Sequence, residues 1–473
     1  MHVRVLMAGW CGVIGMGLAA AGMADDGRSA IVEKIDVVPA WSVHRIGHPV
    51  LLTRDGFQYV GFYDHEARLT LAQRKLGGAD WSFQRFPVRM GWATGGHAML
   101  TLAVDRDGYV HLASYRRTLV ESPPAPHAIY YRSERPHDIG GFERLTMVSE
   151  QERPDYPTFF TGPDGQLYFT YRDGVSGRGN QVYNGYDPDT RTWKRLYDTP
   201  LFDGRNRMNA YGGPRLGPDG LWHALWVWRD TPCNATNHSL SYMRSSDLRR
   251  WETIDGAPVT LPVNSDTPGV IVEPAGPGGG LSNMTFALGW DAQQRPVVSY
   301  HKFDEDGHSQ IYNARFEDGQ WRRVQVTEWT YRWAYDGWGA LPRKVTGGVV
   351  SPTDAGLLQQ TVWNVEAGSQ RILLDAATLE PVRREAPEAP PAWHRTLLAP
   401  ESDFQVPANP TLLRTGGPME VTLINDAGEP AEDGSRYVLR WEHAGGNRDM
   451  PVPEPWPAPT LLRVYRIAGD QAP

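Results

Sequence analysis

Two arginines stand at the ends of strand-like runs of aromatic residues. Arg172 closes the run "YFTYR", and Arg229 closes "ALWVWR". Core packing does not favour a guanidinium at such a position, whereas its planar fork of N–H donors matches a carboxylate, sulfate or phosphate. The pattern therefore indicates a site for an anionic group, and Arg343 in "GALPRK" is a further candidate for it.

Two residues suited to proton transfer precede Arg172. His97 follows two glycines in "TGGHAML". Tyr156 lies in "DYP", sixteen positions before Arg172. A neutral imidazole can act as a general base near pH 7, and a phenol can donate a proton over a short distance. Either residue alone is more often structural at the start of a strand, so this interpretation depends on the arginine that accompanies them.

A second cluster holds residues of the types that bind zinc. His223, Cys233 and His238 fall within "LWHALWVWRDTPCNATNHSLSY". Imidazole and thiolate are zinc ligands, but this spacing matches no standard signature. We expect either a shared metal ion or a buried cysteine with two histidines whose hydrogen bonds go to the backbone.

One turn-and-strand unit recurs along the chain and must position these residues. Each copy begins with a turn, usually Asp-Gly, and continues as a strand of alternating apolar and aromatic residues, as in "DGYVHLASYR". Seven copies begin at Asp55, Asp107, Asp164, Asp219, Asp291, Asp354 and Gly417. Seven such units predict an all-β protein, a single seven-bladed β-propeller, whose ligands bind where the inner strands converge.

Details between the repeats fit the same fold. The segment Ser245–Trp251, "SSDLRRW", is a degenerate Asp-box, and the proline-rich Arg384–Arg395 is expected to be a loop between blades. "LLRVYRI" at Leu461–Ile467 is expected to close the ring beside an N-terminal strand. A pair of β-sandwiches is the alternative, but no linker divides the chain.

Composition and the N-terminus set further bounds. The chain has 473 residues, 50 Gly, 38 Pro and a net charge of −8, which argues against a basic face for nucleic acid. Residues 1–24 have the form of a secretory signal, which predicts a secreted or periplasmic protein of residues 25–473 with no other membrane segment. Cys233 would then be the single cysteine of the mature chain, so no disulfide within it is expected.

Four stretches of the sequence resemble the BNR-repeat propeller proteins, a group that includes the ulvan lyases and the rhamnose–glucuronate lyases. They are "GGHAMLTLAVDRDGYVHLASY", "DYPTFFTGPDGQLYFTYRDGVSGRGNQVYNGYD", "NAYGGPRLGPDGLWHALWVWRDTPCNATNHSLSYMRSSDLRRWE" and "VVSYHKFDEDGHSQIYNARFEDGQW". The match is good over residues 45–325 and looser beyond.

The resemblance implies a polysaccharide lyase that cleaves beside a uronic acid by β-elimination and leaves an unsaturated uronate end. His97, Tyr156 and Arg172 match the catalytic His, the catalytic Tyr and the carboxylate-neutralising Arg of the family. His97 as base with Tyr156 as acid, or Tyr156 in both roles, are equally open. The resemblance also implies an anionic polysaccharide as partner, a monomer, and a structural Zn²⁺ or Ca²⁺ that the chemistry itself does not require.

Contacts to the substrate are expected from three further residues, which are Tyr211, Arg229 and Arg343. Ulvan lyases tend to carry a second histidine where this chain has Arg116 and Arg117. Another uronate polymer or a glucuronate-capped side chain therefore fits as well as ulvan.

Two other classes compete with a lyase. A sialidase-like hydrolase shares Asp-boxes and arginines but needs a Tyr–Glu nucleophile pair, which is not evident in this sequence. A non-catalytic carbohydrate-binding propeller would retain the Trp and Arg residues but would not need His97 together with Tyr156.

Overall fold

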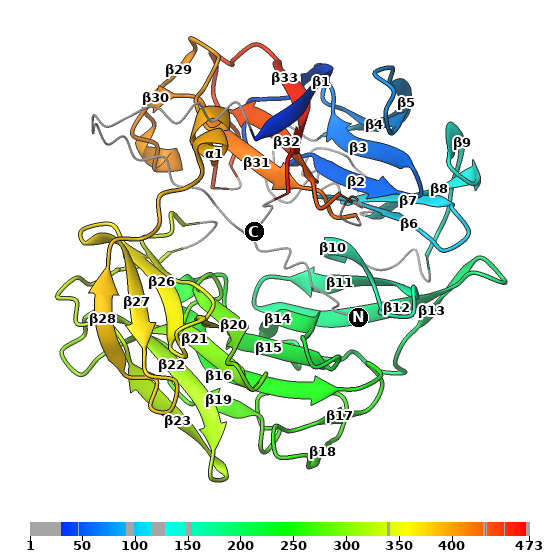
Figure 1. The fold of residues 1–473 in the computed structure, drawn as a ribbon. Helices are drawn as coiled ribbons and strands as arrows, with labels where there is room; N and C mark the ends of the chain where they lie inside the picture. The colour runs from blue at the N-terminus through cyan, green and yellow to red at the C-terminus, as the bar shows by residue number, and fades with distance from the viewer. Residues whose placement is uncertain are drawn as a thin grey trace. The chain divides into compact units, whose positions relative to one another are not determined.

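The computed structural model describes residues 30–45, 47–90, 99–115, 128–147, 154–337, 341–428, 431, 433–448 and 450–469 (Figure 1). The chain divides into two compact units. The first comprises residues 6–172, 184–195 and 390–473, and the second comprises residues 173–183 and 196–389. The secretory signal expected at residues 1–24 and the histidine His97 lie outside the described residues.

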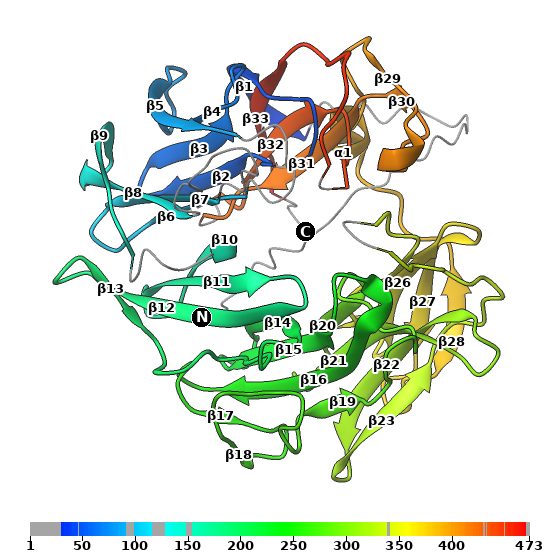
Figure 2. The ribbon, with the colours of Figure 1, turned by 180° about the vertical axis from the view of Figure 1, so that it is seen from behind.

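Four antiparallel sheets belong wholly or mainly to the first unit, and their strands are labelled in Figures 1 and 2. They are formed by β2 (Val50–Arg54), β3 (Phe57–Tyr63), β4 (Arg68–Lys75) and β5 (Ser82–Arg89); by β6 (Leu100–Val104), β7 (Val110–Tyr115), β8 (Ala128–Arg135) and β9 (Asp138–Arg144); by β10 (Pro154–Thr161), β11 (Leu167–Val175), β12 (Arg178–Asp187) and β13 (Thr192–Arg195); and by β31 (Glu420–Asn425), β32 (Arg436–His443), β33 (Thr460–Ile467) and β1 (Ile31–Ala40).

Three further sheets make up the second unit. They are formed by β14 (Asn209–Leu216), β15 (Trp222–Arg229), β16 (Asn237–Ser245), β17 (Trp251–Glu252), β18 (Pro258–Val259) and β19 (Ile271–Glu273); by β20 (Phe286–Trp290), β21 (Pro296–Phe303), β22 (Ser309–Glu317) and β23 (Gln320–Gln325); and by β24 (Val345–Gly347), β25 (Ser351–Pro352), β26 (Leu358–Asn364), β27 (Gly368–Leu374) and β28 (Pro381–Glu385).

The recurring Asp turn joins the first and second strands of a sheet. In "DRDGY", Asp105 Oδ1 accepts hydrogen bonds from the backbone N–H groups of Asp107 (3.0 Å) and Tyr109 (2.9 Å). The glycine that follows has positive φ, 87° at Gly108 and 78° at Gly165, a conformation that glycine adopts without steric cost. This local chemistry explains why the repeats predict the number of sheets.

The seventh repeat is misplaced in the sequence analysis. Gly417 lies in β30 (Gly417–Pro418), which pairs with β29 (Gln405–Val406) and directly precedes the strand β31. The equivalent turn is Asp433-Gly434 between β31 and β32, where Gly434 has φ 74°. An insertion that holds the helix α1 (Ala392–Leu397) and a 3-10 turn separates it from the sixth repeat. Because of this insertion, the spacing of the earlier repeats pointed to the wrong position for the seventh turn.

The two ends of the described chain meet in one sheet. Strand β1 pairs antiparallel with β33, from Ile31 opposite Ile467 to Ala40 opposite Thr460. The prediction that Leu461–Ile467 lies beside an N-terminal strand is confirmed. The proline-rich segment predicted as a loop is in part regular structure, because β28 extends to Glu385 and α1 begins at Ala392.

Candidate active site

Tyr156 and Arg172 lie in neighbouring strands, β10 and β11, of one sheet. The guanidinium of Arg172 lies over the ring of Tyr156, 4.9 Å from its centroid. Nη2 of Arg172 donates to the Asp155 carboxylate, and each residue of this ion pair is 4% exposed. The sixteen-residue spacing thus places Tyr156 and Arg172 in direct contact.

Asp155 ties both partners together. Its Oδ2 pairs with Arg172, while its Oδ1 accepts a hydrogen bond from the backbone N–H of Tyr156 at 3.0 Å. Tyr156 has φ 57°, which is unusual for an aromatic residue and all the more so before a proline such as Pro157. Such strained backbone persists where surrounding contacts hold it, and it occurs often at functional sites.

Arg172 does not end its strand, which corrects the expected boundary. Strand β11 continues to Val175 and returns as β12 from Arg178. The glycine-rich "DGVSGRGN" is therefore a hairpin. Arg172 is buried within the strand and already faces a carboxylate, whereas the sequence suggested an exposed guanidinium at a rim.

Arg229 and Tyr211 form a similar pair in the second unit. Arg229 is the last residue of β15, as predicted, and its guanidinium lies 5.4 Å from the Tyr211 ring centroid. Its Nε donates to the carbonyl of Thr231 at 3.0 Å, and its Nη2 donates to the carbonyl of Pro232. This arginine therefore holds the loop that follows its own strand. Arginine over tyrosine on the adjacent strand is a feature common to both sheets.

Other expected contact residues are less closely defined. Arg343 is partly exposed and lies shortly before β24. The expectation that the arginines, Tyr156 and His97 share one mouth of a channel stays a prediction.

His223 belongs to a hydrogen-bond network in the sheet. Its Nε2–H donates to Asp219 Oδ1 at 2.9 Å, and its Nδ1 accepts from the Tyr242 hydroxyl at 2.6 Å. Burial lowers the pKa of His223 against the opposing effect of the Asp219 hydrogen bond, so the ring is neutral near pH 7. The same network recurs in another sheet with Asp105, His111 and Tyr130.

The three predicted metal ligands do not gather round one ion. His223 pairs with Arg244 and Trp228 pairs with His238 across β15 and β16, so the two histidines lie five residues apart along the hairpin. At about 3.3 Å per residue this is roughly 16 Å, far beyond two Zn–N bonds of about 2 Å. The close sequence spacing was misleading because strands extend their residues.

Cys233 and His238 have partners of their own. His238 Nε2–H donates to Asp230 Oδ1 and Nδ1 accepts from Ser239 Oγ, both at 3.0 Å. Cys233 Sγ accepts from the backbone N–H of Gly337 at 3.4 Å. Within the described ranges, no group of three His, Cys, Asp or Glu side chains is placed to hold a metal ion. A structural zinc or calcium elsewhere stays a prediction.

Asp155 is the residue whose role the sequence analysis missed. The signal for it was its position directly before Tyr156, in a strand that neighbours the one carrying Arg172. A carboxylate there can reach a guanidinium across the sheet, but sequence alone gives no register for that pairing.

Comparison with known proteins identifies a sequence family and several structures of similar fold. The sequence model of the "BNR repeat-containing family member" group matches residues 57–329. The curated protein "Ulvan lyase, long isoform" of Glaciecola sp. (strain KUL10) is 36% identical over 77 residues. That alignment covers 16% of this chain and 6% of the relative, so the chain spans a small part of the relative's length.

Two solved structures share the fold over almost the whole chain. The crystal structure of polysaccharide lyase Uly1 gives a TM-score of 0.57 at 13% identity and covers 93% of this chain and 100% of its own. A PL25 ulvan lyase gives 0.53 at 14% identity and covers 92% and 94%.

These likenesses agree with the seven antiparallel sheets of four or more strands in the described part of the chain. The predicted fold class, an all-β seven-bladed β-propeller, is confirmed. No helix in the described part of the chain is long and apolar enough to cross a membrane. The family model spans more than half of the sequence, and the chain belongs to the BNR repeat-containing family.

Proposed function

We propose that this protein is a polysaccharide lyase that cleaves a uronic-acid-containing polysaccharide by β-elimination. The observation that carries the proposal is the arrangement of Asp155, Tyr156 and Arg172. It places a proton-transfer group in contact with a guanidinium and fixes both with one carboxylate. Tyr156 also has a positive φ, a backbone conformation that occurs often at functional sites.

The chemistry needs these groups for specific bonds. A base removes the proton at C5 of the uronate, and the C–H electron pair forms the C4–C5 double bond while the C4–O4 bond breaks. The departing O4 takes a proton. Negative charge builds on the uronate carboxylate during this step, and a guanidinium that neutralises it stabilises the transition state.

Tyr156 transfers a proton in this proposal, either to O4 alone or from C5 and then to O4. His97 acts as the base in the first case. Arg172 neutralises the uronate carboxylate in this proposal through the positive charge of its guanidinium, which does not lose its proton. Because Arg172 is almost wholly buried, the uronate must approach along the small edge that stays exposed.

Solved relatives support the choice of a uronate. One PL25 ulvan lyase structure was determined with -[GlcA(1-4)Rha3S]- bound, and its fold resembles this chain with a TM-score of 0.52. Glucuronate is the uronate of that ligand. An exported protein, as the sequence of residues 1–24 suggests, fits a polymer substrate outside the cell, and secretion is part of the proposal.

The test is the rate of ultraviolet-absorbing unsaturated product formed from a panel of uronate polysaccharides. Tyr156→Phe and Arg172→Lys should each lower kcat roughly 10²-fold or more, with circular dichroism unchanged. Tyr168→Phe, on the same strand as Arg172, is the matched control and should stay near the wild-type rate. Near-wild-type turnover of Tyr156→Phe would exclude this residue from proton transfer. If Arg172→Lys also stays active, the elimination site lies elsewhere.

A further inference from the structure

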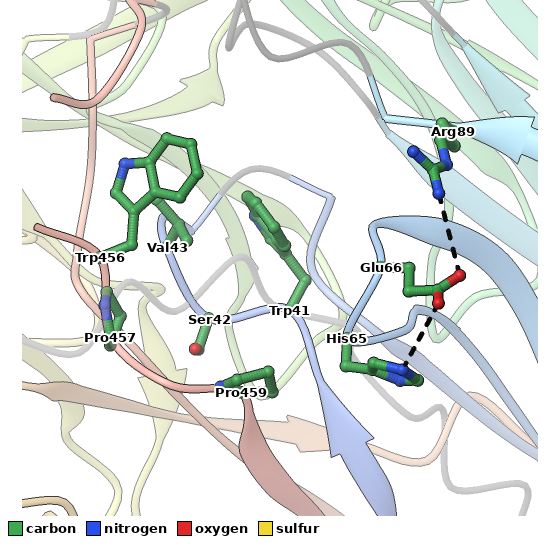
Figure 3. A pocket seen from close by; sticks show the side chains of 9 residues that line it. All are labelled: Trp41, Ser42, Val43, His65, Glu66, Arg89, Trp456, Pro457 and Pro459. Atoms are coloured by element: carbon green, nitrogen blue, oxygen red, sulfur yellow. Dashed lines mark ion pairs between the residues drawn. The ribbon is translucent and has the colours of Figure 1, made fainter. Parts of the chain in front are cut away.

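The first unit contains a cavity of about 380 Å³, and neither Tyr156 nor Arg172 lines it (Figure 3). Four parts of the fold form it: the end of β1, the turn after β3, the end of β5 and the segment before β33. Its volume lies in the usual range of small-ligand sites, about 300–1,000 Å³. The residues that line it are Trp41, Ser42, Val43, His65, Glu66, Arg89, Trp456, Pro457 and Pro459.

One wall of this cavity is aromatic and firmly held. The rings of Trp41 and Trp456 meet edge to face, with centroids 6.2 Å apart and an interplanar angle of 60°. Trp456 Nε1–H donates to the carbonyl of Val452 at 2.9 Å, and Ser42 Oγ–H donates to the carbonyl of Ala458 at 2.9 Å.

The sequence around Trp456 adds stiffness. It reads "PVPEPWPAP", with a proline at every second position from 451 to 459. Proline fixes φ, so this segment loses little conformational freedom when a ligand binds. The apolar wall is therefore preorganised.

The opposite wall carries charge, with a cation in excess. Glu66 bonds to Arg85 at 2.8 Å and to Arg68 at 3.3 Å, and the hydrogen bond from Arg85 lowers the pKa of Glu66. Asp64 also pairs with Arg85, at 2.6 Å. With Arg89, which lies near Glu66, three arginines share the two carboxylates of Asp64 and Glu66.

Arg89 is the least engaged of these arginines. Its side chain is 51% exposed, and in the described part of the chain its one ionic contact is with Glu66 Oε2 at 3.8 Å. That separation is too long for a hydrogen bond. In Figure 3, Arg89, Glu66 and His65 lie to one side of Trp41, and Trp456 lies to the other. An anionic group in the cavity would find a guanidinium on one side and an aromatic face on the other.

We propose that this cavity is a second carbohydrate site, which holds one uronate residue by stacking its sugar ring on Trp456 and pairing its carboxylate with Arg89. A pyranose ring has an apolar C–H face and a polar rim, and the two walls match these in turn. The choice of a uronate rests on the proposed function. This site would bind the sugar without any chemical step. It would hold a polysaccharide chain away from the sheet that carries Tyr156.

The test observes Trp456 directly in full-length protein labelled with fluorotryptophan. The fluorine resonance that disappears in Trp456→Phe belongs to the cavity. It should shift on titration with methyl β-D-glucuronoside, and the uncharged methyl β-D-glucoside should bind roughly two- to fivefold more weakly, because an exposed ion pair contributes modestly. Arg89→Gln should abolish this preference.

Control variants separate this site from the proposed active site. Phe83→Ala removes an exposed aromatic ring from the same strand as Arg89, and Arg135→Gln removes an exposed arginine. Both should leave the titration unchanged, as should Tyr156→Phe even where turnover is lost. A Trp456 resonance that moves with neither sugar would overturn the proposal. Equal binding of both sugars, unaffected by Arg89→Gln, would overturn it too.

Discussion

At the scale of single residues, the carboxylate of Asp155 organises the candidate active site. One oxygen fixes the backbone N–H of Tyr156 in a strained conformation, and the other pairs with a buried guanidinium. Buried ion pairs add little net stability, but removing one partner is costly because a charge stays behind in a medium of low polarity.

Asp155→Ala should therefore lower the free energy of unfolding by about 3–5 kcal/mol, the usual cost of breaking a buried pair. Asp155→Asn keeps an oxygen that can accept from the Tyr156 N–H, so its loss should be smaller. Urea unfolding followed by tryptophan fluorescence measures both. A change below about 0.5 kcal/mol for Asp155→Ala, the size expected of an ordinary surface substitution, would contradict the role assigned to this carboxylate.

At the scale of elements, the turn between β11 and β12 packs closely against a loop of the next sheet. The β11–β12 turn packs on the loop after β15, because a Cβ added to Gly177 would lie 2.8 Å from Thr231 Cα and 2.9 Å from Asp230 O. The Thr231 carbonyl also accepts a hydrogen bond from Arg229. A glycine in this turn thus allows the hairpin to pack on the loop that Arg229 holds.

Gly177→Ala and Gly165→Ala form a matched pair, since the two glycines have φ of 79° and 78°. A Cβ at Gly165 meets nothing within 4 Å, so this variant should lose only about 1 kcal/mol, from the unfavourable φ. Gly177→Ala should lose about 1–3 kcal/mol more because backbone atoms must move. Thermal and urea unfolding compare the two. Equal losses would show that the close packing at Gly177 is unimportant.

The same scale shows what the sequence could predict. The turns that begin with Asp are local, since an Asp oxygen and a positive-φ residue, usually glycine, act within four residues, and they predicted six of the seven sheets in the correct place. The Asp155–Arg172 pair and the separation of His223 from His238 depend on strand register, which no local pattern encodes. The seventh turn was predicted at the wrong position because the repeat pattern does not indicate the length of the insertion that contains α1.

At the scale of the whole molecule, buried neutral histidines couple stability to pH. His301 is fully buried, and its Nδ1–H donates to the carbonyl of Gly280 at 2.5 Å. The rings of Phe303, Trp333 and Tyr335 surround it. Burial lowers the pKa of His301 from 6.5 to about 4.

The sign of the effect follows from proton binding. Between pH 6.5 and about 4 the unfolded chain binds a proton at His301 that the folded chain does not, so stability falls as pH falls through this window. The shift corresponds to about 3 kcal/mol. His301→Asn keeps a donor for Gly280 but cannot titrate. Between pH 7 and pH 4 its free energy of unfolding should therefore fall by about 3 kcal/mol less than that of the wild type. Urea unfolding at both pH values measures this, and an equal fall in the two proteins would contradict the prediction.

The central claim is that the protein breaks its substrate by elimination. The most direct measurement is mass spectrometry of the fragments that a susceptible uronate polysaccharide yields. Elimination adds no water, so we predict that each cut leaves one fragment with an unsaturated uronate end, lighter by one water than the saturated fragment of the same sugars, and that these fragments are lost in Tyr156→Phe. Saturated fragments that have gained one water per cut would show a hydrolase and contradict the account.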